Sequence, residues 1–375
     1  MAIGCPERYA VNVSRQAGNM TLQGQHPTVT GQLSDIASVE WGRILNDIAT
    51  ATIVVTKCPD NCALFAEPFE DSVPARPWSH EVRIFRDNTV AFEGPIVRVR
   101  DRPTEIEILA YDMVGWVNRR EVREAYTHTG DAVTIAANLL DTYFPPSDPW
   151  LMYQVLNTAV GSLDVEYDRA QYVIGQKWAD LVKSGLNYST LGRHILMFGQ
   201  TPANVSTPYL LNIGDILGEA ELLLDGLDFG THAVCLGDGL AHGVGPTASD
   251  EALFGKVTYP PTRFPDVRDQ ADLVVLTEAF YDRKRDMKPR LVIPSGSTLS
   301  SSAEIYATGY ELYSDVELVA LPQLMCGFRY DIQVQEPYCH PGRYPMRLGQ
   351  LKVAWTPEKG ETVQVSFTDL GVLPE

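Results

Sequence analysis

The sequence predicts a mainly β protein with a small α-rich unit. Two observations lead to this class. Residues 1–125 have the pattern of strands, which is clearest between Trp78 and Asp112, where turn residues separate the runs. Between residues 126 and 200 the apolar residues recur at helical spacing, and strand and turn patterns resume from residue 201. We therefore expect three domains: 1–125 (β), 126–200 (small, helical or mixed) and 201–375 (β-rich, with one helix at about 267–285).

The first clear element is a β-hairpin. Val82 and Ile84 alternate with Arg83 and Phe85, Asp87-Asn88 supplies a two-residue turn, and Thr89 to Glu93 forms the returning strand.

A second hairpin follows Gly94-Pro95. We expect one strand at 96–100, a four-residue turn at 101–104 and the return at 105–111. With a loop of that length, Arg100 faces Glu105 and Arg98 faces Glu107. Opposite charges then share one face and β-branched residues the other, as a half-buried antiparallel ribbon requires.

Helical spacing defines the middle of the chain. One stripe begins at Asp131 and runs to Tyr143, where Pro145-Pro146 stops it. A second stripe lies between Ala170 and Val182, and a strand at 194–198 closes this unit. Further strands are expected at 221–227, 233–236, 351–355 and 362–367.

Composition narrows the classes of function. Of the 375 residues, 45% are hydrophobic and 21% charged, which excludes wholesale disorder and a coiled-coil rod. The 30 basic and 48 acidic residues give a net charge of −18. Because nucleic-acid affinity comes largely from Lys and Arg that displace counterions, we expect DNA to pass this protein without specific binding.

No membrane or export segment is apparent. No apolar run approaches the roughly 20 residues that a membrane helix needs, and residues 1–9 lack the basic and apolar regions of a secretory signal. We therefore expect no membrane insertion and synthesis in the cytoplasm.

The cysteines are sparse, and two of them lie close together. Cys58 and Cys62 could join Cys326 or the Cys339-His340 pair in a zinc site, or they could be small thiols in a loop. The spacing is looser than that of a zinc-finger knuckle, so we expect neither a bound metal nor a disulfide framework.

No catalytic signature stands out. The glycine-rich run 237–245 has His242 where a dinucleotide-binding motif needs its third glycine, so we expect a flexible loop there. The sequence has no P-loop, no G-x-S-x-G elbow and no H-E-x-x-H helix. A Cys-His-Asp arrangement assembled in space remains open. The carboxylates of Glu105 and Glu107 are expected to be held ionised by arginines, the wrong state for a general acid. We expect no enzyme and no cofactor.

The hairpin region also carries a family pattern. Its parts are residues 76–87, 92–97 and 106–112, followed by Trp116. This pattern resembles the minor tail proteins of long, non-contractile phage tails (siphoviruses) that infect actinobacteria, and among them the tail hub or baseplate hub family. The likeness continues more faintly through most of the chain. The residues that carry it are Pro77, Trp78, His80, Gly94, Pro95, Asp112 and Trp116.

The resemblance implies a virion structural protein. In such hubs two tail-tube-like antiparallel β-barrels per subunit, joined here by the helical unit, form a ring from three chains. The ring joins the sixfold tail tube to the threefold tip and lines the channel for genome ejection. The implied partners are two further copies of the chain, the distal tail protein, the tape measure protein, other minor tail proteins and the passing DNA. The implied location is the tail tip, after assembly in the host cytoplasm.

Two other functions stay open. Six tryptophans and 17 tyrosines could supply stacking platforms for a receptor- or carbohydrate-binding tail protein. A cell-wall hydrolase is the other alternative, although no signature of one is present.

Overall fold

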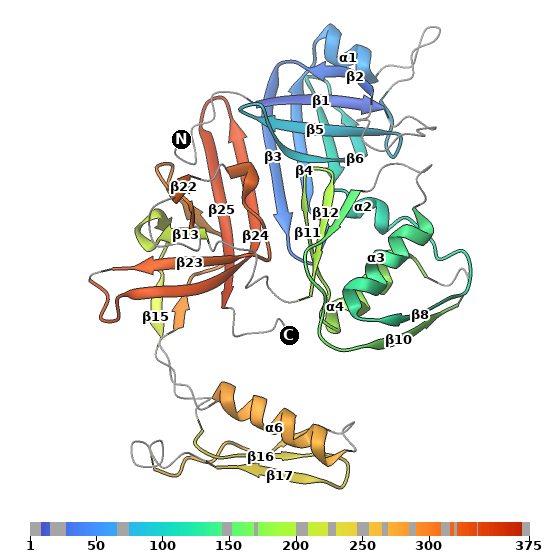
Figure 1. The fold of residues 1–375 in the computed structure, drawn as a ribbon. Coiled ribbons are helices and arrows are strands. Elements are labelled where there is room, and N and C mark those ends of the chain that lie inside the picture. Colours follow the sequence, from blue (N-terminus) through green and yellow to red (C-terminus); the bar gives the residue numbers. More distant parts are fainter. Residues whose placement is uncertain are drawn as a thin grey trace. The chain divides into compact units, whose positions relative to one another are not determined.

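The computed structural model describes residues 9–15, 28–65, 75–144, 152–168, 172–199, 209–223, 230–245, 255–264, 269–284, 290–308, 316–318, 321–335 and 337–369. The chain forms two compact units (Figure 1). The first comprises residues 1–219, 293–335 and 342–370, and the second comprises residues 220–292, 336–341 and 371–375.

The protein is mostly β with few helices, as the sequence predicts. The first unit contains β1 (Tyr9–Arg15), β2 (Thr28–Leu33), β3 (Ile36–Ile44), β4 (Thr50–Thr56), α1 (Pro59–Phe65), β5 (His80–Arg86), β6 (Thr89–Asp101), β7 (Glu105–Tyr111), α2 (Val114–Val117), β8 (Tyr126–Gly130), α3 (Ala132–Tyr143), β9 (Met152–Val155), β10 (Leu163–Tyr167), α4 (Ile174–Lys183), β11 (Asn187–Leu191), β12 (His194–Phe198), β13 (Tyr209–Asn212), η1 (Ile213–Asp215), β14 (Ile216–Leu217), β20 (Ser297–Leu299), β21 (Tyr306–Thr308), β22 (Val316–Leu318), η2 (Leu321–Gln323), β23 (Arg329–Val334), β24 (Gly342–Thr356) and β25 (Gly360–Asp369). The second unit contains β15 (Glu221–Leu223), β16 (Ala233–Leu236), β17 (Ala241–Val244), β18 (Thr262–Arg263), α6 (Gln270–Lys284) and β19 (Arg290–Val292).

One large sheet dominates the first unit. Its strand order is β2-β1-β5-β6-β7-β4-β3-β24-β23-β13-β21-β22, with β14, β20 and β25 joined alongside. Within the described residues this order runs from β2 to β22 without returning to its start, so the sheet is not a closed barrel.

Strands from the two ends of the chain share this sheet. β24 pairs antiparallel with β3, which places Val353 opposite Trp41. Both residues are fully buried. Residues near 40 and 350 thus lie in one continuous sheet. The strand pairing does not test the expected domain boundaries at 125 and 200, which stay a prediction.

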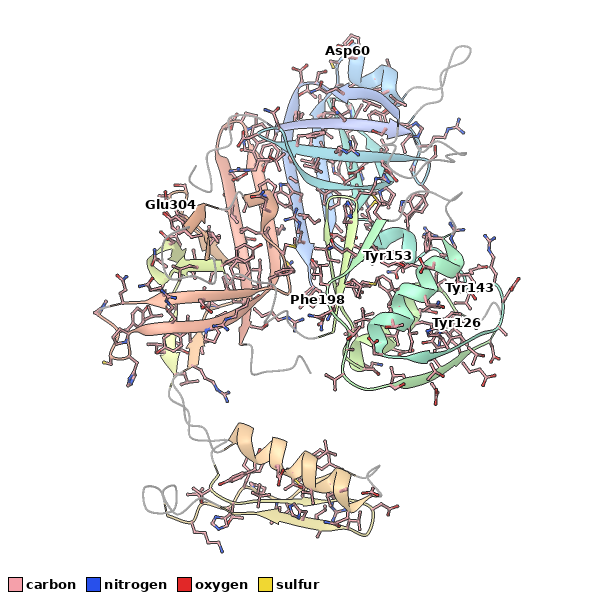
Figure 2. All side chains as sticks on the ribbon, in the orientation of Figure 1. Asp60, Tyr126, Tyr143, Tyr153, Phe198 and Glu304 are labelled. Atoms are coloured by element: carbon pink, nitrogen blue, oxygen red, sulfur yellow. The ribbon has the colours of Figure 1, made fainter. Side chains whose placement is uncertain are left out.

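The expected helices form, and they enclose a separate core. Asp131 begins α3 as its N-cap and accepts hydrogen bonds from the backbone N–H groups of Val133 and Thr134. α3 and α4 bury apolar faces that include Leu139 and Trp178. The rings of Tyr126 and Tyr143, labelled in Figure 2, pack together with a centroid separation of 6.3 Å.

The second unit is a small sheet covered by a helix. β17, β16 and β18 form three strands in that order, and α6 packs against β16 and β17 (Figure 1). Two expectations change here. The run 237–245 is not a loop throughout, because a turn closed by a hydrogen bond between Gly237 N and Leu240 O leads into β17. Of the strand expected at 221–227, only residues 221–223 lie within the described part.

The first hairpin forms as expected. Arg86 pairs with Thr89, and the intervening Asp87 and Asn88 have φ values of 48° and 67°. Two positive φ angles are typical of a type I′ turn, whose twist matches that of the flanking strands. After it, however, β6 continues as one strand through Gly94-Pro95 and does not break there.

Gly94 is required by a close approach of two backbone segments. A Cβ atom at this position would lie 2.0 Å from the carbonyl oxygen of Tyr111 and 2.9 Å from Cα of Asp112. Both obstacles are backbone, so no side chain can move aside.

We expect Gly94→Ala to destabilise the protein by about 1–3 kcal/mol, because the added methyl forces β6 away from the end of β7. Urea unfolding measures this difference. Gly349→Ala is the matched control, since its Cβ would lie no closer than 3.5 Å to Ser366 O. Equal effects of the two substitutions would contradict the steric explanation.

Candidate functional site

The family-pattern residues meet at one junction in the first unit. The ring of Trp78 packs edge-on against Trp116, with centroids 5.3 Å apart, and lies 6.2 Å from the ring of Tyr111. The guanidinium of Arg119 lies 4.5 Å from the centroid of Trp78. Trp78 has a φ of 61° and donates its N–H to Ile96 O at 2.7 Å. The junction therefore joins the segment before β5 to β6 and to the turn after α2.

Asp112 is the polar centre of this junction. Its Oδ2 accepts from the N–H of Ala49 at 3.2 Å and from the hydroxyl of Thr190 at 2.9 Å, and its Oδ1 accepts from the N–H of Val114 at 3.1 Å. The side chain thus joins three segments that are distant in sequence. Burial raises the pKa of Asp112 to about 7, although these three hydrogen bonds oppose the shift.

A buried charge network lies beside the junction. Arg193, 4% exposed, bonds to Glu81 and, at 2.9 Å, to Glu93. Arg83 reaches the same Glu93 oxygen at 2.6 Å. Burial lowers the pKa of Arg193 to about 10, so it stays charged at neutral pH. The neighbouring His80 is fully buried, and its Nδ1 accepts from the N–H of Arg76 at 3.1 Å. These bonds fix the start of β5 against β6.

Two further arginines were not singled out by the sequence. Arg43 is buried on β3 and donates to the carbonyl oxygens of Leu324, Ala91 and Pro322 at 2.6–3.0 Å. Arg86 forms a two-point contact with Glu361, at 2.9 Å for each bond, and the Glu361 side chain is fully buried.

The second hairpin forms with a different register from the one expected. The loop contains two residues, Pro103-Thr104, because Arg102 N donates to Glu105 O at 2.9 Å. Pro103 suits this turn because its ring fixes φ near the value that the first turn position needs. A loop shorter by two residues shifts the pairing of residues 98–101 by two, so Arg100 lies opposite Glu107.

The expected pair of Arg100 with Glu105 is therefore wrong, whereas the contact of Arg98 with Glu107 is present at 3.5 Å. Glu107 also contacts Arg100 at 3.3 Å and Arg102 at 2.7 Å, and Glu105 contacts Arg102 at 2.5 Å. A two-residue shift leaves every side chain on its expected face.

The face of the large sheet that carries these pairs is exposed. Along β4, β24 and β25 its side chains are mostly Thr, Gln and Lys, including Thr50, Gln350 and Gln364. Lys352 pairs with Glu40 at 3.0 Å across this face.

The candidate metal ligands do not meet. Cys58 and Cys62 are free and half-buried, at the start of α1, and Cys58 Sγ lies 3.3 Å from Ser34 Oγ. Cys326 is buried in the first unit, where its Sγ contacts Arg43 O at 3.4 Å. In the described residues no three His, Cys, Asp or Glu side chains are grouped for a metal. That these cysteines bind no metal stays a prediction.

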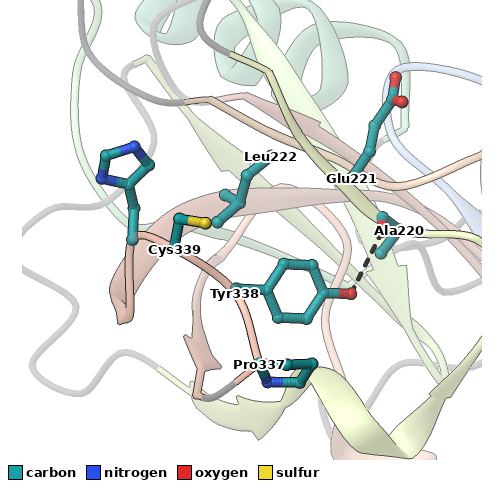
Figure 3. Close-up of a pocket in the computed structure, with 7 residues that line it drawn as sticks. Ala220, Glu221, Leu222, Pro337, Tyr338 and Cys339 are labelled. Atoms are coloured by element: carbon teal, nitrogen blue, oxygen red, sulfur yellow. Dashed lines mark hydrogen bonds between the residues drawn. The ribbon is translucent and has the colours of Figure 1, made fainter.

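A pocket of about 460 Å³ lies in the second unit (Figure 3). Tyr338 crosses it and donates its hydroxyl to Ala220 O at 3.2 Å. Cys339 and His340 on its wall are exposed. Because water reaches both side chains freely, the pocket does not shield a nucleophile, and we assign no reaction to it. Its lining residues are Ala220, Glu221, Leu222, Pro337, Tyr338, Cys339 and His340.

Known proteins resemble this chain in structure and not in sequence. No family model matches it, and no curated protein matches its sequence. The 43 kDa tail protein of prophage MuSo2 from Shewanella oneidensis matches with a TM-score of 0.54 at 10% identity, over 96% of this chain and 98% of that one. Prophage tail protein gp18 from Listeria monocytogenes matches at 0.50 and 11% identity, over 95% and 94%.

A chain of a PdpA-VgrG complex shares the fold as well. The Francisella PdpA-VgrG complex, in its half-lidded form, contains a chain that matches at a TM-score of 0.53 and 10% identity, over 99% of this chain and 59% of that one. The chain therefore has the fold of phage tail proteins and of VgrG-like proteins, along its whole length. Among the described helices, none is long and apolar enough to span a membrane.

We expect the stability of the protein to depend on the ionisation of Asp112. The folded-state pKa of about 7 lies above the ordinary value. The associated stability is therefore complete below about pH 4 and is lost as pH rises through 7, by at most about 1.4 kcal/mol per pH unit. Urea unfolding of the wild type and of Asp112→Asn between these pH values measures the loss. As pH rises, the free energy of unfolding of the wild type should fall relative to that of the variant. A constant difference would show that the carboxyl is not shifted.

Double-mutant cycles test the corrected hairpin register. We expect Arg102 and Glu107 to couple by about 0.2–1 kcal/mol, because the pair is partly exposed. Arg100 and Glu105 should show no coupling, since they are not in contact. The reverse result would support the four-residue loop.

Proposed function

We propose that this chain is a structural protein of a phage tail and acts as the hub at the tail tip. The single observation that carries the proposal is the match of the whole fold to the Shewanella prophage tail protein, over 96% of this chain and 98% of that one. The proposal is thus an analogy of fold, which the labelling experiment below tests.

The hub role extends the family pattern around Trp78, Gly94 and Asp112. We infer that three copies form a ring that joins the sixfold tail tube to the threefold tip. The ring would contact the distal tail protein, the tape measure protein and other minor tail proteins. The chain would be assembled in the host cytoplasm and remain in the virion.

The charge supports a channel through which DNA moves. A net charge of −18 means that a wall built from this chain can avoid fixed cations, which would otherwise retain phosphate groups.

We further propose that the chain is not an enzyme. The carboxylates that sequence analysis considered, Glu105 and Glu107, both contact arginines. The pocket around Tyr338 has exposed walls. Zymography on host cell-wall material is expected to show no hydrolysis, and turnover that disappears on substitution of Cys339 or His340 would overturn this part of the proposal.

Labelling of intact particles tests the tail role. We expect antibodies against this chain to bind at the tail tip of purified virions, and mass spectrometry of those virions to detect the chain. Labelling along peripheral fibres, or the absence of the chain from purified particles, would contradict the hub proposal. Binding of the isolated protein to host cells or host glycans would favour the receptor-binding alternative.

A further inference from the structure

Several strand edges in the first unit have no neighbouring strand among the described residues, and two of them, on β6 and β10, carry rows of charged side chains. β5 pairs with β6 up to Pro95, and residues 98–101 of β6 pair only with β7. β10 pairs with β8 and, in the described part, with no other strand. An unpaired edge exposes N–H and C=O groups in the pattern that another strand can bind.

The β6 edge carries a row of arginines. Arg98 and Arg100 lie two residues apart on one face, and Arg102 follows at the same spacing. Their side chains are 51%, 48% and 43% exposed. All three arginines contact the carboxylate of Glu107, and Arg102 also contacts the carboxylate of Glu105. Three guanidinium groups against two carboxylates leave a local excess of positive charge, in a chain whose net charge is −18.

The β10 edge carries the opposite row. Asp164 and Glu166 are exposed and two residues apart, whereas Tyr167 is buried against the helical core. Asp164 accepts a hydrogen bond from the hydroxyl of Thr129 at 2.6 Å. Within the described residues no ion pair joins Asp164 or Glu166 to a cation. These carboxylates are therefore available to a basic partner.

We propose that β10 of one copy adds to the β6 edge of a second copy of this chain, with Asp164 and Glu166 beside Arg98 and Arg100. Side chains on one face of a strand repeat about every 7 Å on both edges, so the two charge rows can match step by step. Opposite charges on neighbouring strands stabilise the pairing, and backbone hydrogen bonds supply the remaining affinity.

The occupant is a second copy because the chain supplies both halves of the contact. Copies with a charge of −18 repel one another, so assembly needs a local attraction of this kind. The contact joins two different surfaces, and such contacts repeat from copy to copy and can close into a ring. In this respect the inference rests on the proposed ring, whereas the strand pairing can be tested in isolated protein.

Charge reversal tests the pairing. Analytical ultracentrifugation at low ionic strength measures self-association of the full chain over a range of concentrations. We expect the wild type to associate. The double variants Arg98→Glu/Arg100→Glu and Asp164→Arg/Glu166→Arg should each associate with an affinity lower by about tenfold or more. The chain with all four substitutions, and an equal mixture of the two double variants, should regain association. Lys352→Glu is the control, because β24 is paired on both sides at that residue, and it should associate like wild type.

Circular dichroism and thermal melting establish that each variant is folded, and Arg98→Gln/Arg100→Gln replaces the glutamate variant if that one does not fold. Wild-type association in either double variant, or no recovery in the fourfold variant, overturns the pairing. A wild type that stays monomeric at every concentration overturns it too. None of these results removes the proposed tail role, which labelling of particles tests separately.

Discussion

The pairing of β3 with β24 determines how the first unit is built. It brings a strand near residue 40 against one near residue 350. The ion pair of Arg86 with Glu361, 275 residues apart in sequence, lies in the same layer and is buried. Loss of one partner of such a pair leaves an uncompensated buried charge, at a cost of about 3–5 kcal/mol. The order of the other strands in the sheet depends on the pairing of β3 with β24.

Interior arginines explain how so acidic a chain holds its segments together. Arg43 bonds to three backbone carbonyls, and Arg347 bonds to the side chain of Asn187 at 2.5 Å. Acidic side chains are buried as well, among them Glu81, Glu93 and Asp112, so the interior holds charges of both signs.

Local structure could be predicted from the sequence, and long-range contacts could not. The turn at Asp87-Asn88 and the N-cap at Asp131 follow from residue types that favour those conformations. The register of the second hairpin was missed because its charge pattern fits two loop lengths, and the hydrogen bond of Arg102 N decides between them. The resemblance identified Gly94 and Asp112. Their roles, and the partners of Arg43, depend on segments that meet only in the folded chain.

A reconstruction of the tail tip tests the central claim most directly. The account predicts three copies of this chain in a ring around a channel, with more Asp and Glu than Lys and Arg on the channel wall. A chain located in a peripheral fibre, or a channel wall with a net positive charge, would contradict it.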